Sequence, residues 1–422
     1  MKAAVTLALS MFVIPSVYAE ETAEELRAHV QELTREVGQL RGEVKDMDAR
    51  TEALANQQEA AAQKGPAATS AVNPLSIWGY GEITYNRPVH DSAATQIDLN
   101  RAVFGFGYRF DDQTRFNSEF EIEHAVASAD DKGEVEVEQF YIDHALLPAA
   151  NLKAGLFLIP MGLLNESHEP NYFYGVERNF VETAIIPTTW REGGVGLYGS
   201  TSRGIAWDVG LTTGFDLGKW DPTSADGQEL PLASIHQELS EAQAHDLSTY
   251  AAASYRGIPG WVAGASVFTG KVAQGNPAIS MASDARLTLW EAHTRWTPGN
   301  ADLSALYARG AISDTAALNA SFAGDPTLVP EEFWGWYAQA AYKLAINERR
   351  SVAPFVRYER FNTGAGYAQL PTGTPAALPT ESVWTYGVNF NLNPNVVFKA
   401  DYQAFREDSD RDRFDLGLGL MF

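Results

Sequence analysis

Residues 161–189 read MGLLNESHEPNYFYGVERNFVETAIIPTT and separate two strand-like segments, 151–160 and 191–201. The stretch follows neither the period of two of a strand nor the 3.6-residue period of a helix. It is rich in aromatic residues and carries ionisable side chains of both signs, which are Glu166, His168, Glu169, Glu177, Arg178 and Glu182. A connection this long is uncommon in a compact domain unless it has a function. We therefore predict that residues 161–190 fold into a β-barrel and narrow it.

Composition limits the classes of protein to which the chain can belong. It has 422 residues, a formal net charge of −23 and no cysteine. Disulfides and thiolate metal sites are therefore excluded. The acidic balance argues against a nucleic-acid partner, because neutralising phosphates requires a basic surface. The mean hydropathy of −0.22 disfavours a helical membrane protein. A membrane barrel remains compatible with it, because the strands of such a barrel alternate between apolar and polar residues.

The N-terminal residues 1–19 are expected to be a secretory signal peptide. Lys2 supplies the positive start, residues 3–14 the apolar core, and the sequence Val17-Tyr18-Ala19 a cleavage site. The alternative is a short membrane anchor. It is disfavoured because the apolar run falls short of the roughly 20 residues that span a bilayer. We expect an exported mature protein.

Residues 20–64 have a different pattern from the rest of the chain. Leu26, Val30, Leu33, Val37 and Leu40 begin a series of apolar residues at alternating spacings of four and three. This pattern is typical of a coiled coil, in which a narrow apolar stripe is buried against a second helix. The alternative is a helix that folds against its own domain. Residues 65–74 are a linker by composition.

From residue 75 onward the dominant period is two, which is typical of strands. Sixteen strand-like segments follow, at 77–86, 96–109, 114–126, 134–146, 151–160, 191–201, 205–215, 245–256, 261–272, 285–297, 301–310, 333–344, 351–361, 382–392, 396–405 and 411–422. We predict an all-β fold, a 16-stranded antiparallel transmembrane β-barrel over residues 75–422, preceded by the N-terminal α-helical coiled coil.

The connections between these segments alternate in length. Short ones such as 110–113 and 393–395 contain turn-forming residues, whereas long ones include 161–190 and 216–244. Bacterial outer-membrane barrels have short periplasmic turns and long external loops. An even number of strands leaves both chain ends in the periplasm, where the coiled coil is expected to lie.

The polar face of several segments carries many charges, which would be costly to bury in a packed core and suit a water-filled lumen. These lumen candidates are Arg101, Arg115, Glu119, Glu121, Glu123, Arg191, Arg357, Glu359, Lys399 and Asp401. The series Glu119, Glu121 and Glu123 has two interpretations, a cation-attracting part of the pore and simple solvation of a wide vestibule. Arg178 and Arg191, together with basic residues of the wall, are expected to oppose the acidic groups across the constriction.

The segment 77–86 (IWGYGEITYN), residues 165–189 and the terminal Phe422 resemble outer-membrane porins of the phosphate-selective O and P type. Within this family the chain is similar to the branch with an N-terminal coiled coil, which includes dicarboxylate-type channels. The resemblance covers residues 75–422. It implies a homotrimer of sixteen-stranded barrels, each with its third external loop folded inward. It also implies that Phe422 is part of the signal for the barrel-assembly machinery.

The implied function is passive diffusion of small hydrophilic solutes, with small anions such as phosphate or dicarboxylates as the first choice, and with outer-membrane lipid around the barrel. The phosphate-selective members have many arginines and lysines in their pores, whereas this sequence mixes the two signs. A structural alternative is a protein that tethers the membrane to peptidoglycan through its coiled coil. Neither an enzyme nor a metal or cofactor is expected, because Ser167, His168 and their acidic neighbours match no catalytic or zinc pattern.

Overall fold

The computed structural model describes residues 73–128, 132–370 and 376–422. The predicted signal peptide, the predicted coiled coil and most of the predicted linker lie outside these residues. Residues 73–422 form a compact unit of their own. Among the described residues, no helix is both long enough and apolar enough to cross a membrane.

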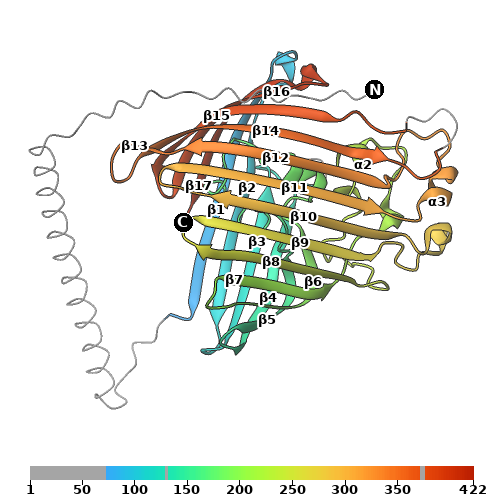
Figure 1. Ribbon diagram of the computed structural model, residues 1–422, viewed down its shortest axis with the longest axis horizontal. Coiled ribbons are helices and arrows are strands. Elements are labelled where there is room, and N and C mark those ends of the chain that lie inside the picture. Colours follow the sequence, from blue (N-terminus) through green and yellow to red (C-terminus); the bar gives the residue numbers. More distant parts are fainter. Residues whose placement is uncertain (1–72, 129–131, 371–375) are drawn as a thin grey trace, which may run out of the picture. The chain divides into compact units, whose positions relative to one another are not determined.

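The strands form one closed antiparallel sheet (Figure 1). They are β1 (Leu75–Pro88), β2 (Gln96–Arg109), β3 (Thr114–Glu123), β4 (Val135–Leu147), β5 (Ala150–Leu158), β6 (Arg191–Ser200), β7 (Ile205–Thr212), β8 (Ser248–Ile258), β9 (Trp261–Lys271), β10 (Arg286–Trp296), β11 (Ala301–Ile312), β12 (Glu332–Tyr342), β13 (Leu344–Ala345), β14 (Ser351–Gly366), β15 (Glu381–Asn393), β16 (Val396–Phe405) and β17 (Arg413–Met421).

The predicted barrel of sixteen strands is confirmed. The two-residue β13 continues β12 after a break at Lys343, and both pair with β14, so the wall has sixteen strands. Each strand pairs with its neighbour in the chain, and β1 closes the ring by pairing with β17. The backbone of Phe422 extends this closure through reciprocal hydrogen bonds with Gly79, 3.1 and 2.8 Å long.

Within the described residues, the helical turns lie in connections between strands, and Figure 1 shows α2 and α3 at the same end of the strands. They are η1 (Ser92–Ala94), η2 (Val181–Ile185), η3 (Leu217–Lys219), α2 (Asp226–Glu229), η4 (Ala233–Ile235), η5 (Pro277–Ala282), α3 (Ala316–Ser321) and η6 (Ser409–Arg411). The short connections lie at the opposite end, together with the C-terminus.

Alternating side chains face the inside and the outside of the barrel, as the period of two predicts. In β2 the residues Arg101 and Val103 are buried, whereas Phe104, Phe106 and Tyr108 are exposed. An apolar outer surface with polar inner residues is the arrangement of a membrane barrel.

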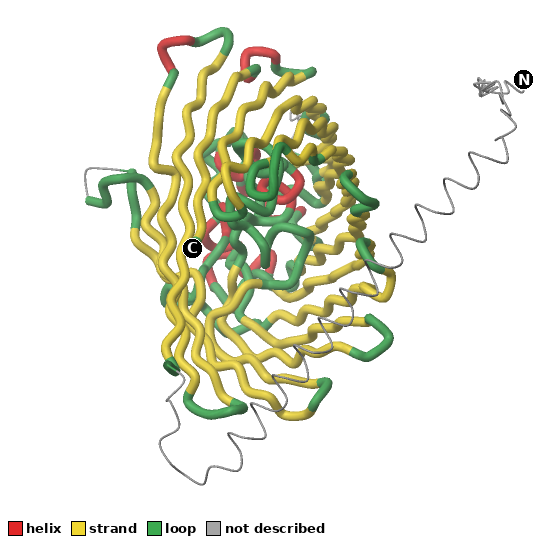
Figure 2. Tube along the Cα trace, turned by 90° about the vertical axis from the view of Figure 1, so that its left-hand side faces the viewer, coloured by secondary structure: helices red, strands yellow, loops and turns green. Residues whose placement is uncertain are grey.

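The interior departs from the uniformly wet lumen expected from the sequence. Figure 2 shows loops and helical turns inside the ring of strands. Inward-facing apolar residues of β9–β12, among them Phe268, Leu289 and Phe333, pack with the long loops into one buried cluster. Trp190 lies at its centre, with its ring 4.6 Å from that of Phe268. Alternation alone did not reveal this core, because both faces of these strands carry apolar residues.

Candidate functional site

The third loop, residues 159–190, leaves the wall where two neighbouring strands are short. β5 has 9 residues and β6 has 10, whereas β14 has 16. The loop therefore begins inside the height of the barrel. Its residues Ile159, Met161, Ile185, Ile186 and Trp190 belong to the buried apolar cluster. Burial of these side chains favours a loop position within the barrel.

Glu182 fixes the two halves of the third loop to each other. Its Oε1 accepts hydrogen bonds from the backbone N–H groups of Leu163 and Leu164, at 2.6 and 2.8 Å. Its Oε2 accepts from Asn179 Nδ2 at 2.8 Å and from the hydroxyl of Tyr337 on β12 at 3.0 Å. One buried carboxylate thus joins the start of the loop, its return segment and the wall.

The return segment is bound to the wall opposite β5 and β6. The Asp401 carboxylate on β16 accepts from the backbone N–H of Val176 at 2.5 Å. On β14, Glu359 accepts from Phe180 N–H at 2.6 Å and Arg357 donates to the Tyr174 carbonyl at 3.0 Å. A loop that contacts both walls crosses the lumen.

The tip of the third loop reaches the short-turn end of the barrel. Asn171 donates a hydrogen bond of 2.8 Å to the carbonyl of Pro394, in the turn between β15 and β16. Lys399 lies 3.5 Å from the centre of the Phe173 ring, a cation–π contact. At Gly419 a Cβ atom would lie 2.6 Å from Pro170. Glycine is needed there because the loop approaches the strand so closely.

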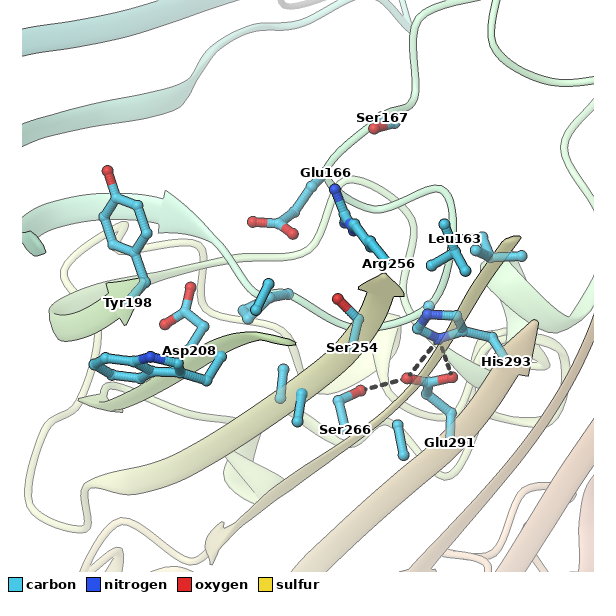
Figure 3. Close-up of a pocket in the computed structure, with 18 of the residues that line it drawn as sticks. Leu163, Glu166, Ser167, Tyr198, Asp208, Ser254, Arg256, Ser266, Glu291 and His293 are labelled. Atoms are coloured by element: carbon cyan, nitrogen blue, oxygen red, sulfur yellow. Dashed lines mark hydrogen bonds and ion pairs between the residues drawn. The ribbon is translucent and has the colours of Figure 1, made fainter. Parts of the chain in front are cut away.

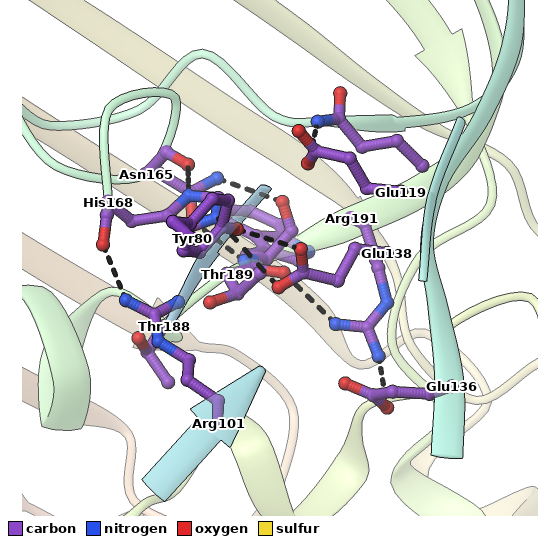
Figure 4. A network of polar contacts seen from close by, with 12 residues as sticks. Tyr80, Arg101, Glu119, Glu136, Glu138, Asn165, His168, Thr188, Thr189 and Arg191 are labelled. Carbon is purple, nitrogen blue, oxygen red and sulfur yellow. Dashed lines mark hydrogen bonds and ion pairs between the residues drawn. The ribbon is translucent and has the colours of Figure 1, made fainter. Parts of the chain in front are cut away.

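A polar network joins the loop to β1, β2 and β4 (Figure 4). The His168 ring lies 2.6 Å from the Tyr80 hydroxyl, and that hydroxyl lies 3.0 Å from Glu138. Arg101 donates to the His168 carbonyl at 2.5 Å and pairs with Glu82 at 2.8 Å. His168 is therefore a buried anchor of the loop, and does not project into open space.

A cavity of about 220 Å³ lies between the third loop and the wall formed by β1, β2, β3 and β17. We call it the charged cavity. Its ionisable lining residues are Glu82, Arg101, Glu121, Glu123, Glu177, Arg178 and Arg413. Four carboxylates and three guanidinium groups thus face one small volume.

Further cavities lie on other sides of the loop. One of about 230 Å³ is lined by Glu166 and Ser167 of the loop and by Asp208, Arg256 and Glu291 of the wall (Figure 3). Ser167 lines this cavity whereas His168 faces Tyr80, so the two do not form a nucleophile–base pair. Another, about 540 Å³, lies at the short-turn end, and its charged lining residues are Arg295, Lys343, Glu348, Arg349 and Arg350.

The residues predicted for the lumen fall into separate groups. Those in the charged cavity are Arg101, Glu121, Glu123 and Arg178. Glu119 and Glu166 line a cavity of about 300 Å³ beside Trp78 and Lys153. Those buried by contact with the loop or its neighbours are His168, Arg191, Arg357, Glu359, Lys399 and Asp401. Glu169 is half-buried in the loop, and Arg115 is exposed near the short-turn end of β3, away from the third loop.

Several residues of the site were not among the sequence candidates. Glu82 and Arg413 line the charged cavity, and Glu136, Glu138 and Tyr80 belong to the network beside it. Alternation places Tyr80 and Glu82 on one face of β1, so this signal was available. The β-bulge opposite Glu119 and Phe120 shifts the register of β4, so simple alternation misplaces Glu138.

Electrostatics in the loops follow from burial and pairing. Burial and the nearby Arg101 lower the pKa of Arg178 to about 10, so its guanidinium is charged at neutral pH. Burial raises the pKa of Glu182, and its hydrogen bonds oppose that rise. A hydrogen bond with His236 lowers the pKa of Glu238 to about 2. Glu238 also pairs with Arg191 at 3.2 Å, which attaches the loop 213–247 to β6.

Replacing Arg178 with alanine removes one of the three positive groups of the charged cavity. We expect the permeability ratio of cations to anions to rise about twofold, because the carboxylates then dominate the field. Reversal potentials across a salt gradient in planar bilayers measure this ratio. Arg203→Ala, in an exposed short turn, is the control. Unchanged selectivity and conductance in Arg178→Ala would show that Arg178 does not line the pore.

The closed barrel with an internal loop is a fold that the chain shares with solved outer-membrane porins. The chain is similar to Salmonella typhi OmpF, solved in complex with daunomycin, with a TM-score of 0.60, 12% identity, and coverage of 84% of this chain and 99% of that one. It is also similar to the channel DcaP of Acinetobacter baumannii, with a TM-score of 0.51, 14% identity, and coverage of 82% and 97%. These likenesses show the fold.

Sequence comparison gives the family. A protein of Aquifex aeolicus (strain VF5), described as uncharacterized, is 31% identical over 374 residues, which cover 85% of this chain and 83% of the relative. The chain belongs to the family of that protein. No protein-family model matches the chain.

Proposed function

We propose that this protein is an outer-membrane porin through which small hydrophilic solutes diffuse passively. The observation that carries the proposal is the third loop, which crosses a closed barrel and leaves a small charged cavity beside the wall. The outward-facing apolar side chains support a location in lipid. No catalytic step is part of this proposal.

The solute path in this proposal runs through the charged cavity. Arg101 is held on β2 by Glu82, and Arg178 projects from the loop. Glu121 and Glu123 face them from β3. Fixed charges of opposite sign across a narrow opening create a transverse field, which orients water and polar solutes. The hydrogen bonds of Glu182 and Asp401 keep the loop, and hence the width of the opening, in place.

Small anions such as phosphate or dicarboxylates are the solutes that we propose first. The support is the cavity at the short-turn end, where Lys343, Arg349 and Arg350 are accompanied by one acidic lining residue, Glu348. Arg295 also lines this cavity but is paired with Asp302 at 2.6 Å. A cluster of positive groups raises the local concentration of anions. The mixed charges of the charged cavity lead us to expect a modest preference.

The oligomer and the N-terminal region complete the proposal. We propose a homotrimer, with residues 20–64 as a coiled coil in the periplasm. We also propose that Phe422, whose backbone pairs with Gly79 of β1, is part of the signal for the barrel-assembly machinery. Chemical cross-linking of the protein in native outer membranes tests the trimer.

Planar-bilayer recording of the purified full-length protein tests the channel. We expect discrete conductance steps, and reversal potentials across a salt gradient that indicate a modest anion preference. A preference for cations would contradict the proposed anion preference but would not contradict the proposed channel function. Correctly inserted barrels without any conductance would contradict the porin proposal itself.

Deletion of residues 20–63 is expected to leave the single-channel conductance largely intact, because the proposed solute path lies wholly within residues 75–422. Conductance of the deletion variant and of the full-length protein is compared in the same bilayers. Complete loss of channel activity in a correctly inserted variant would show that the N-terminal region forms part of the path.

A further inference from the structure

Four glutamates crowd the inner wall where β3 and β4 border the charged cavity. The carboxylate oxygens of Glu121, Glu123 and Glu136 lie within 4.8 Å of one another. Glu121 and Glu136 face each other directly in the pairing of β3 with β4. Glu121 and Glu123 also line the charged cavity, which gives the group access to solutes. We call Glu121, Glu123, Glu136 and Glu138 the carboxylate cluster.

The surroundings of Glu138 are the observation that indicates a bound ligand. Its side chain is fully buried and its Oε1 has no hydrogen-bond partner. Its carboxyl group lies within hydrogen-bonding reach of that of Glu121. Two carboxylates in contact have only acceptor atoms to offer each other, so a cation or a proton must lie between them. The partners of Glu138 are the Tyr80 hydroxyl, 3.0 Å from Oε2, and the His168 ring, 3.8 Å from Oε1. They leave the buried carboxylate incompletely paired, which is costly, and a bound cation would lower that cost.

The positive side chains nearby do not balance the cluster. Arg191 pairs with Glu136 at 2.5 Å and with Glu238 at 3.2 Å. Arg101 pairs with Glu82 at 2.8 Å. Among the ion pairs of the described residues, neither Glu121 nor Glu123 has a partner within 4.0 Å. Among the described residues, the ion pairs of the cluster within 4.0 Å are therefore Arg191 with Glu136 and the His168 ring with Glu138 at 3.8 Å.

We propose that the carboxylate cluster binds one hard divalent cation of the calcium class. All four side chains offer oxygen ligands, and Ca²⁺ takes six to eight oxygens from mono- or bidentate carboxylates and water. The Arg191 guanidinium occupies Oε2 of Glu136, which leaves Oε1 of Glu136 as the ligand. β3 and β4 carry all four proposed ligands, and His168 of the third loop lies 3.8 Å from Glu138.

A cation at this site changes the charge of the pore wall. Glu121 and Glu123 face Arg101 and Arg178 across the charged cavity. Neutralising these glutamates leaves the guanidinium groups dominant, so bound calcium favours anion passage. This consequence rests on the proposed channel function. The binding site itself does not.

Terbium luminescence on the purified full-length protein in detergent tests the binding. Tb³⁺ replaces Ca²⁺ at oxygen sites, and two aromatic side chains beside the cluster are suited to sensitise it. The Trp78 indole is 2.6 Å from Glu119, and the Tyr80 hydroxyl is 3.0 Å from Glu138. The variants are Glu121→Gln and Glu123→Gln. Glu134→Gln is the matched control, because it removes a nearby exposed carboxylate that is outside the cluster.

We expect a saturable signal in the unmodified protein that millimolar Ca²⁺ displaces and K⁺ at the same ionic strength does not. Either cluster variant is expected to weaken Tb³⁺ binding on the order of tenfold, since affinity follows the number of charged ligands. The Glu134→Gln variant keeps the affinity. An absent or Ca²⁺-insensitive signal in the unmodified protein would overturn the proposal. It would mean that the carboxylates share protons and bind no cation. Equal affinity in all variants would overturn the proposal as well. Either failure leaves the bilayer test of the channel unaffected.

Discussion

Glu182→Ala is expected to release the third loop and to raise the single-channel conductance, with frequent switching between conductance levels. The carboxylate accepts four hydrogen bonds, from Leu163 N–H, Leu164 N–H, Asn179 and Tyr337. Alanine leaves these donors unpaired in a buried site, at a cost of about 3 kcal/mol or more. We expect the loop to shift until water can hydrogen-bond to these donors, which widens the opening between the loop and the wall.

Two variants control for the loss of charge. Glu182→Gln keeps an oxygen for the backbone donors but presents an amide to Asn179 and Tyr337, so an intermediate effect is expected. Glu177→Gln removes another carboxylate of the same loop, one that accepts a single hydrogen bond of 3.2 Å, from Asn86. Planar-bilayer recordings compare all three variants. A steady conductance in Glu182→Ala, equal to that of Glu177→Gln, would show that Glu182 does not hold the loop.

Arg357→Ala is expected to cause the largest loss of stability among single changes in the barrel wall. Arg357 is 2% exposed and its Nε donates to Glu359 at 2.7 Å, and Glu359 is completely buried. Removing the arginine leaves an unpaired buried carboxylate and a free Tyr174 carbonyl. Breaking a buried ion pair in this way costs about 3–5 kcal/mol. The unfolding midpoint in guanidinium chloride, followed by electrophoretic mobility without heating, measures the loss.

Arg309→Ala is the matched control for Arg357→Ala. Arg309 pairs with Glu332 at 2.9 Å, but their side chains are 46% and 38% exposed. An exposed pair of this kind contributes about 0–1 kcal/mol. Equal midpoints for the two variants would mean that water reaches Arg357 and that the third loop does not cover it.

The alternation of apolar and polar residues predicted the barrel wall, because successive side chains of a strand face opposite sides of the sheet. A shift of one residue would move every side chain of the strand to the other side, so the pattern defines which residues face inward. The bounds of β2 and β16 agree with the segments 96–109 and 396–405 expected from sequence. The last strand was predicted to start at 411, but residues 409–411 form the turn η6. Local turn chemistry at Asp408, whose side chain caps that turn, explains the difference.

The site was less predictable than the wall. Alternation identifies which residues face inward, but it does not tell which of them the third loop covers. Lys399, Asp401, Arg357 and Glu359 face inward as predicted, yet they are buried as partners of the loop. The contacts between Asn171 and Pro394 join residues 223 positions apart. No local pattern encodes such a contact, because it depends on how two distant segments pack.

The loop position also explains why inward-facing glycines occur in β17. Gly417 and Gly419 lie on the inner face, where Cβ atoms would meet Val176 at 3.2 Å and Pro170 at 2.6 Å. Larger residues there would push the loop away from the wall. In sequence, the two glycines read only as small residues in a strand.

Cross-linking between residues 176 and 417 tests most directly that the third loop lies inside the barrel. The chain has no cysteine, so Val176→Cys with Gly417→Cys creates a single possible disulfide. A Cβ atom at position 417 would lie 3.2 and 3.4 Å from the two methyl carbons of Val176, so the side chains at these positions are in contact, as a disulfide requires. Oxidation of the double variant in outer membranes is expected to form this disulfide in nearly all molecules, seen as faster migration in denaturing, non-reducing gels. Val176→Cys with Leu416→Cys, whose second position faces outward, is predicted to form none. Failure of the 176–417 pair to cross-link in folded barrels would contradict the account.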